Sequence, residues 1–76
     1  MTDVYFPKMS DAPGATGILV TWFVDSGDDV SPATLIAEVA MDKVDAEVYP
    51  ETTGKISVLV EEGTEVLQGT VIARVT

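Results

Sequence analysis

Cysteine and histidine are both missing from this sequence of 76 residues. Without cysteine the chain can form neither disulfides nor thiolate metal sites. Without histidine it lacks the commonest general base and the commonest metal ligand. The acidic residues near the turns do not have the ordered spacing of known calcium loops, so we expect no metal site. These absences argue against a conventional enzyme active site.

Positive charge is also scarce, with four basic residues against thirteen acidic ones and a net charge of −9. Because phosphate backbones and anionic lipids repel such a surface, we expect neither nucleic acid nor membrane partners. No apolar run approaches the roughly 18 residues of a membrane span. The start, Met1-Thr2-Asp3, lacks the basic flank of a signal peptide, which predicts a cytoplasmic protein. Residues 1–76 provide room for one small domain, expected to be monomeric in isolation.

A helical period of 3.6 residues is sustained nowhere in the chain. Short β-branched runs alternate instead with turn residues, which is typical of all-β sandwiches and barrels. Residues 25–29 and 61–64 are rich in the acidic residues and glycine that turns favour. The expected strands are Val4–Pro7, Ile18–Val24, Leu35–Ala40, Val44–Tyr49, Lys55–Val60 and Val71–Val75.

The chain contains an internal repeat, in which residues 24–39 recur as residues 60–75. Seven of the sixteen aligned positions are identical, among them the turn glycine. Upstream, Gly17 and Gly54 fall out of this register by one residue, which a β-bulge would absorb. Two copies of a strand–turn–strand unit predict two similar sheets related by a pseudo-twofold axis.

Residues 35–48 connect the two halves and form a good candidate β-hairpin. With Asp42-Lys43 as a two-residue loop, Met41 faces Val44 and the apolar residues gather on one face. Asp-Lys is not a pair that the primed hairpin turns favour, so we expect a turn resembling type I. In this register Lys43 lies at the extreme tip. The other expected pairs are Val39 with Ala46, Ala37 with Val48, Ala40 with Asp45 and Glu38 with Glu47.

A lysine at the tip of a hairpin is well placed for covalent attachment of a group. Its amine sits on a flexible four-carbon stem and can enter another protein's active site while its own domain stays folded. An exposed turn lysine is, however, most often a solvated surface charge. The residues alone leave both interpretations of Lys43 open.

Several short motifs of the sequence match those of a known family. They are Phe6-Pro7-Lys8-Met9, Gly17-Ile18, Trp22-Phe23-Val24, Ser26-Gly27-Asp28-Asp29-Val30, Glu38–Val44 and Gly63–Gly69. In these motifs the chain resembles the lipoyl domains of 2-oxo acid dehydrogenase acyltransferases, over nearly its whole length. The resemblance implies a flattened β-barrel of two four-stranded antiparallel sheets with quasi-twofold symmetry. It also implies lipoate in amide linkage to Lys43, with Met41, Asp42 and Val44 flanking the attachment site.

The resemblance implies a carrier without catalytic residues, forming part of a dihydrolipoamide acyltransferase. The implied partners are a lipoate-attaching enzyme, a thiamine-diphosphate-dependent decarboxylase, the acyltransferase core and dihydrolipoamide dehydrogenase. We expect Asp42, Val44 and the Pro7–Gly17 loop, which lies near the lysine in the family, to contact them. The chain stops at Thr76 without the Ala/Pro-rich linker that usually follows, so we expect a domain of a longer acyltransferase.

Two alternatives accompany the lipoyl interpretation. Ala40-Met41 stands where the family usually has Glu-Thr or Ser-Thr, and an Ala-Met pair near the lysine resembles the Ala-Met-Lys-Met motif of biotinyl domains. Here, however, Asp42 intervenes, and Val44 replaces the second methionine. The first alternative is therefore a biotinyl carrier domain of a carboxylase. The second is an unmodified lipoyl-like interaction module.

Overall fold

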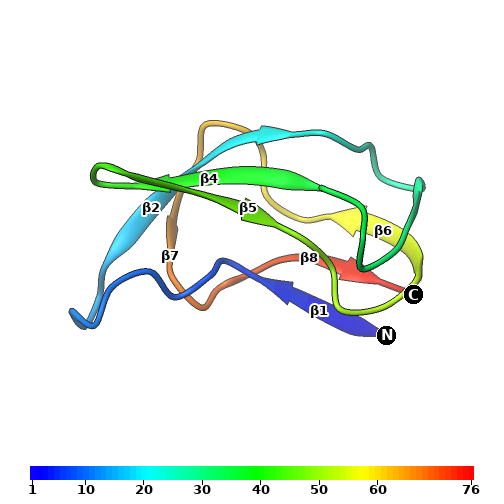
Figure 1. Cartoon of the computed structure of the whole chain (residues 1–76), viewed down its shortest axis with the longest axis horizontal. Helices are drawn as coiled ribbons and strands as arrows, with labels where there is room; N and C mark the ends of the chain where they lie inside the picture. Colours follow the sequence, from blue (N-terminus) through cyan, green and yellow to red (C-terminus); the bar gives the residue numbers. More distant parts are fainter.

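Two four-stranded antiparallel sheets face each other in this protein, as Figure 1 shows for the computed structural model, which describes all residues 1–76. One sheet has the strand order β1-β8-β6-β3 and the other β5-β4-β2-β7. The expected all-β sandwich is confirmed. No helix is present that is long and apolar enough to cross a membrane. The strands are β1 (Thr2–Tyr5), β2 (Thr16–Trp22), β3 (Asp29–Val30), β4 (Ala37–Met41), β5 (Val44–Val48), β6 (Gly54–Val58), β7 (Glu65–Leu67) and β8 (Val71–Val75).

The six strands expected from the sequence pattern are all present, with ends that differ by up to two residues. Strand β1 starts at Thr2 and stops before Phe6-Pro7, which fits the inability of proline to donate a ladder hydrogen bond. The pattern missed β3 and β7, which have only two and three residues. Strands this short carry too few alternating positions to produce a periodic signal.

The sheet orders confirm the pseudo-twofold symmetry expected from the repeat. Strands β2, β3 and β4 correspond to β6, β7 and β8, and each occupies the same place in its own sheet. Equivalent backbone hydrogen bonds recur 36 residues apart: Phe23 donates to Ile36 at 2.9 Å, and Leu59 donates to Ile72 at 3.0 Å. Strand β3 pairs with β6, and β7 pairs with β2, so each half supplies the edge strand of the other half's sheet. The halves therefore depend on each other to fold.

The one-residue slip in the repeat is a β-bulge in β2, as expected. Leu19 pairs with Val39 and Thr21 pairs with Glu38, which leaves Val20 as the extra residue. Beside the bulge, one carboxylate oxygen of Glu62 accepts hydrogen bonds from the Trp22 backbone amide and the Thr21 hydroxyl, both at 2.7 Å. The Trp22 amide and then the Thr21 hydroxyl lower the pKa of Glu62 from its ordinary value.

The Glu62 contacts predict a pH-dependent contribution to stability. A carboxylate whose pKa falls on folding stabilises the fold above its unfolded pKa and loses that effect as the pH drops through its folded pKa. The difference in unfolding free energy between wild type and Glu62→Gln should thus be largest near neutral pH and shrink below about pH 4. Urea titrations at several pH values, followed by Trp22 fluorescence, measure this difference in unfolding free energy. Glu61→Gln is the matched control, because Glu61 is the exposed neighbour of Glu62 and its side chain forms neither of these hydrogen bonds.

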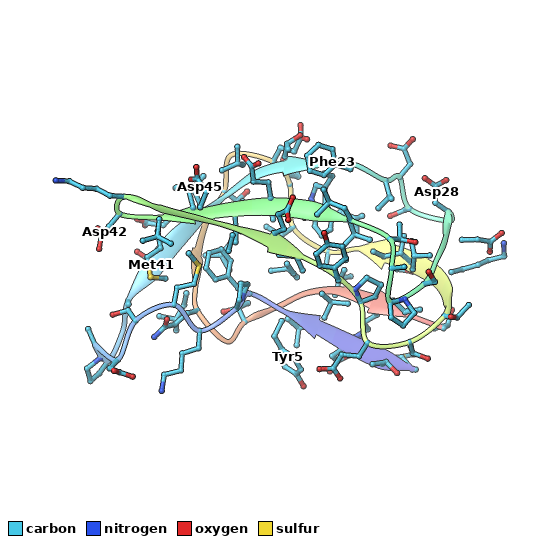
Figure 2. All side chains as sticks on the ribbon, viewed as in Figure 1. Tyr5, Phe23, Asp28, Met41, Asp42 and Asp45 are labelled. Atoms are coloured by element: carbon cyan, nitrogen blue, oxygen red, sulfur yellow. The ribbon has the colours of Figure 1, made fainter.

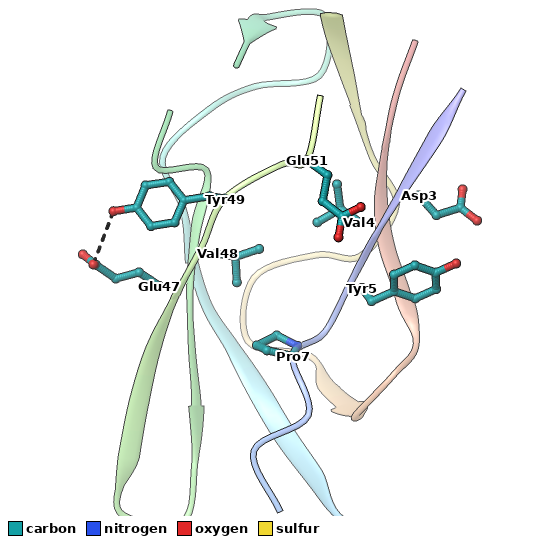
Figure 3. A pocket seen from close by; sticks show the side chains of 8 residues that line it. All are labelled: Asp3, Val4, Tyr5, Pro7, Glu47, Val48, Tyr49 and Glu51. Atoms are coloured by element: carbon teal, nitrogen blue, oxygen red, sulfur yellow. Dashed lines mark hydrogen bonds between the residues drawn. The ribbon is translucent and has the colours of Figure 1, made fainter. Parts of the chain in front are cut away.

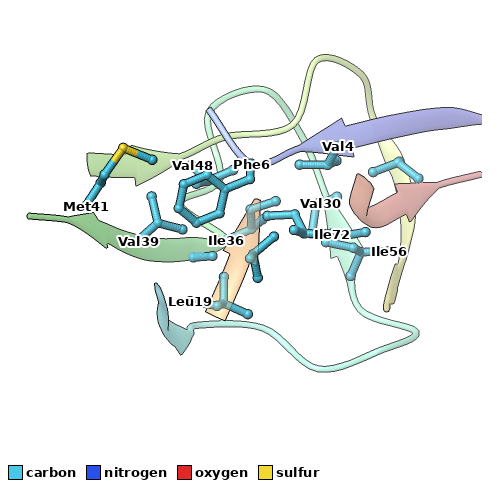
Figure 4. Packing of buried hydrophobic residues seen from close by; sticks show 14 residues of the cluster. Val4, Phe6, Leu19, Val30, Ile36, Val39, Met41, Val48, Ile56 and Ile72 are labelled. Carbon is cyan, nitrogen blue, oxygen red and sulfur yellow. The ribbon is translucent and has the colours of Figure 1, made fainter. Parts of the chain in front are cut away.

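Fourteen buried apolar residues form one continuous core between the two sheets (Figure 4). Phe6, Leu19 and Ile36 are fully buried near the middle of it, and Met41 closes the cluster at the hairpin end. No buried side-chain nitrogen or oxygen lacks a hydrogen-bond partner. The core therefore reaches to within two residues of Lys43 and anchors the hairpin from beneath.

Candidate functional site

The β4–β5 hairpin has the register expected from the sequence. Met41 pairs with Val44, and the other four expected pairs are present along the two strands. On β4 the side chains of Ala37, Val39 and Met41 are buried, while those between them are only half-buried. The alternation locks the hairpin in register, because a slip of one residue would turn the apolar side chains outward. Asp42 and Lys43 are the two residues of the turn.

The conformation of that turn differs from our expectation. Asp42 has φ of 53° and is the only non-glycine residue of the protein with a positive φ. A type I turn has negative φ at both central residues, so the expected type I-like turn is wrong. A positive φ at the first central residue alone is the sign pattern of type II′, whose twist matches that of paired strands. Aspartate tolerates this conformation better than most residues, because its short polar side chain can hydrogen-bond locally.

Lys43 is the only basic side chain of the protein without an ion pair. Lys8 pairs with Asp11, Lys55 with Asp29 and Arg74 with Asp3. The Lys43 amine makes no hydrogen bond to any protein group and its side chain is exposed. Because this amine forms no hydrogen bond or ion pair, the side chain can change conformation without losing either.

The charged side chains of the hairpin other than Lys43 are all acidic. Glu38, Asp42, Asp45 and Glu47 are the four carboxylates on β4, the turn and β5, and none of them forms an ion pair. Glu38 and Glu47 face each other across the strands, as expected. In Figure 2 Asp42 lies at the far end of the hairpin and Asp45 projects from the side away from the protein body. A protein that approaches Lys43 therefore meets an acidic surface.

The two apolar residues predicted to flank the attachment site have different environments. Met41 is 5% exposed and belongs to the core, so it supports the hairpin from inside. Val44 is 57% exposed although it follows Lys43 directly. An exposed valine beside the lysine is available for contact with a partner, whereas Met41 is not.

The β1–β2 loop, residues 6–15, lies at the same end of the long molecular axis as the hairpin tip (Figure 1). Where the loop enters β2, Ile18 pairs with Ala40, three residues before Lys43. Gln68, in the β7–β8 turn, holds the loop: its Oε1 accepts from the amides of Met9 and Ser10 at 3.1 and 3.2 Å, and its Nε2 donates to the Ser10 carbonyl at 2.8 Å. Gln68 lies within the Gly63–Gly69 motif, but it was not predicted to have a role at the site. The only sign in the sequence was that the internal repeat aligns Gln68 with a different residue, Pro32.

One concave surface of the protein lies away from the hairpin tip. It is a groove of about 290 Å³ between the edge strands β1 and β5 (Figure 3). Three carboxylates and two tyrosines line it, and the Tyr49 hydroxyl hydrogen-bonds Glu47 at 3.4 Å. Lys43 and the other turn residue, Asp42, are not part of the groove. Lys43 therefore lies on a projection and not in this groove.

Comparison with known proteins identifies the family of this chain. The family model described as "Biotin-requiring enzyme", which covers biotin and lipoyl domains, matches residues 2–75. Sixty residues of the chain are 38% identical to a protein of Staphylococcus aureus (strain Mu50 / ATCC 700699) named dihydrolipoyllysine-residue acetyltransferase component of pyruvate dehydrogenase complex. A protein of the same name from Staphylococcus epidermidis (strain ATCC 12228 / FDA PCI 1200) is 37% identical over the same length.

These alignments include 78% of the present chain but only 14% of each relative. The likeness thus concerns one domain of proteins that are several times longer. The family match covers nearly every residue, and the expected fold with its exposed lysine hairpin is present. This chain belongs to the biotin/lipoyl attachment family.

Proposed function

We propose that this chain is a lipoyl carrier domain in which Lys43 bears lipoate through an amide bond. The observation that carries the proposal is the position of Lys43 at a two-residue hairpin tip, as the one basic side chain of the protein without an ion pair. The names of the two relatives refer to dihydrolipoyllysine, which favours lipoate over biotin.

The residues around Lys43 suit a long attached group. The Lys43 side chain is exposed, and attachment to its amine would disturb no hydrogen bond or ion pair. Acylation would remove the only positive charge of the hairpin and leave its four carboxylates. Within the hairpin, residues 37–48, Val44 is the only large apolar side chain that is exposed.

The folded domain would hold the attached lipoyl group and bring it to successive active sites. When attached, lipoate supplies a dithiolane that can accept an acyl group and electrons at one active site and release them at others. The chain holds the arm on a rigid hairpin, anchored by buried Met41 and Val39. Tethering of this kind gives a local concentration on the order of millimolar at each active site. We propose that the domain serves a 2-oxo acid dehydrogenase complex in the cytoplasm, as part of an acyltransferase.

The partners that follow from this proposal are four. They are a lipoate-attaching enzyme, a thiamine-diphosphate-dependent decarboxylase, the acyltransferase core and dihydrolipoamide dehydrogenase. Each must bring a surface to the acidic hairpin and the exposed Val44. Since charge steers encounter between proteins, we expect these surfaces to be basic and their association with this domain to weaken with added salt.

Two parallel ligase reactions test the proposal. The purified chain is incubated with ATP, lipoate and a lipoate–protein ligase, and separately with ATP, biotin and a biotin–protein ligase. Intact mass should show one lipoyl group added in the first reaction and none in the second, because Val44 and Asp42 occupy the positions that biotin attachment requires to be methionine. Peptide mapping should place the group on the peptide that contains Lys43.

The other outcomes decide against lipoate. A biotinyl group alone would make the chain a carboxylase carrier domain. No group from either ligase, on a chain shown by circular dichroism to be folded, would identify an unmodified interaction module.

A further inference from the structure

The groove between β1 and β5 is built from two copies of one short motif. Asp3-Val4-Tyr5 on β1 recurs as Glu47-Val48-Tyr49 at the end of β5. These two tripeptides supply six of the eight residues that line the groove. Because β1 and β5 hold equivalent places at the edges of their sheets, the groove shares the pseudo-twofold symmetry of the fold.

Each copy of the motif divides its residues between the core and the surface. The two valines are buried and belong to the core, so they line the groove from the core side. The two tyrosines are exposed, by 54% for Tyr5 and 45% for Tyr49. Figure 3 shows their rings pointing away from each other, one on the β1 side of the groove and the other on the β5 side. Packing of the core therefore accounts for the valines of both copies but not for the tyrosines or the carboxylates.

The backbone edges of β1 and β5 are open at the groove. Each strand has a hydrogen-bonded neighbour on one side only, and the two strands belong to different sheets. In such an edge strand every second residue directs its N–H and C=O groups away from the sheet, where another strand can pair with them. The other two edge strands, β3 and β7, have only two and three residues, and shortness is one way in which proteins protect an edge. With four and five residues, β1 and β5 are longer.

The two walls of the groove differ in the charge that they leave free. On the β1 side Asp3 is paired with Arg74 at 3.1 Å. On the β5 side Glu47 and Glu51 form no ion pair. A cation placed there gains from a carboxylate and from the face of the Tyr49 ring. A second copy of this chain is a poor occupant, because its free edges carry the same acidic side chains and like charges repel across paired strands.

We propose that the groove binds an extended segment of a partner protein in which basic and apolar residues alternate, added as a strand to the free edge of β5. Side chains of a strand alternate between its two faces. The segment would therefore place its apolar side chains toward Val4 and Val48 and its basic ones beside Glu47 and Tyr49. In this mode of recognition main-chain hydrogen bonds give affinity and alternate side chains give specificity. The inference goes beyond the carrier function and does not require lipoate on Lys43.

Synthetic peptides test the proposal on the intact chain. The probe is a capped hexapeptide in which valine and arginine alternate, and its control has the same composition in two blocks, three valines followed by three arginines. In NMR titrations the alternating peptide should bind about tenfold more tightly, since only alternation places all three arginines on one face of a strand. Amide hydrogen exchange should slow in β5 and stay unchanged in β7, the opposite edge of the same sheet.

Variants of the β5 wall locate the binding site. The double variant Glu47→Gln, Tyr49→Leu loses a carboxylate and an aromatic face, and both side chains are exposed, so the fold should remain. Its Kd for the alternating peptide should rise about fivefold or more. Glu61→Gln removes the same charge from an exposed position outside the groove and should change the Kd by less than about twofold. If the double variant does not fold, Glu47→Gln alone decides, with an expected rise of about two- to fivefold.

Three results would overturn the proposal. Equal affinity of the two peptides would mean that binding follows net charge alone. An unchanged Kd in the wall variants, or exchange that slows in β7 and not in β5, would place the peptide elsewhere. Self-association of the chain without peptide, lost in the double variant, would assign the groove to a second copy. Lipoylation of Lys43 is measured in a separate reaction, so none of these results bears on the carrier function.

Discussion

Replacing Lys43 with arginine is expected to abolish lipoyl attachment completely. Arginine keeps the positive charge and the length of the side chain, but its guanidinium does not form the amide bond. The fold should be unaffected, because Lys43 is exposed and makes no ion pair or hydrogen bond. Intact mass after exhaustive reaction with the ligase measures the yield, and thermal unfolding checks the fold.

The other two lysines are the matched controls for this experiment. Lys8→Arg and Lys55→Arg should both accept one lipoyl group, because Lys8 lies in the β1–β2 loop and Lys55 pairs with Asp29 at 3.0 Å. Attachment that persists in Lys43→Arg and disappears in either control would show that the site has been misassigned.

A swap of the two turn residues tests the geometry of the tip and not only its composition. In the double variant Asp42→Lys, Lys43→Asp, the lysine occupies the residue with φ of 53°. Its side chain then leaves the hairpin in another direction, and the longer residue is less suited to a positive φ. A displacement of the reacting atom of this kind should slow lipoylation by about tenfold or more. If the lipoylation rate is unchanged, the enzyme does not depend on the position of the lysine within the hairpin turn.

Replacing Gly17 with alanine should cause a large loss of stability. A Cβ at Gly17 would lie 2.5 Å from the Ala40 carbonyl oxygen and 2.5 Å from the Phe6 ring. Neither neighbour can yield easily, since one is backbone of β4 and the other is fully buried. Overpacking of this kind should cost about 3 kcal/mol. A chain of this size has a total stability of about 4–11 kcal/mol.

Thermal unfolding followed by circular dichroism measures the effect of Gly17→Ala. We expect the melting temperature to fall by roughly 15 °C, given about 4–8 °C per kcal/mol for a small domain. Gly14→Ala is the control: Gly14 has φ of 74°, and a Cβ there would meet nothing within 4 Å. It should cost only about 1 kcal/mol of backbone strain. Equal losses in the two variants would refute the close packing of Gly17 as the cause.

Much of the fold could be predicted because its signals are local or periodic. The alternation in residues 37–48 determined the hairpin register, since only one register gathers the apolar side chains on one face. The repeat at 36 residues predicted the symmetry and the bulge that the structure has at Val20. The position of Lys43 at the tip followed from the same register.

The edge strands could not be predicted from the pattern. Strands β3 and β7 have two and three residues, and each pairs with a strand of the other half. Their strand character comes from a neighbour more than 20 residues away and not from their own alternation. The turn conformation at Asp42 was likewise missed, because the twist of the paired strands overrides the preference of an Asp-Lys pair.

By itself the sequence determined the all-β class, the twofold repeat and a lysine at the tip of a hairpin, because side-chain alternation encodes each of these locally. Only the tertiary structure decided what surrounds that lysine. Gln68 meets Met9 and Ser10 across 59 and 58 residues of chain, and Glu62 meets Trp22 across 40. Contacts so distant in sequence form only when both sheets close around the common core, and no period in the sequence records them.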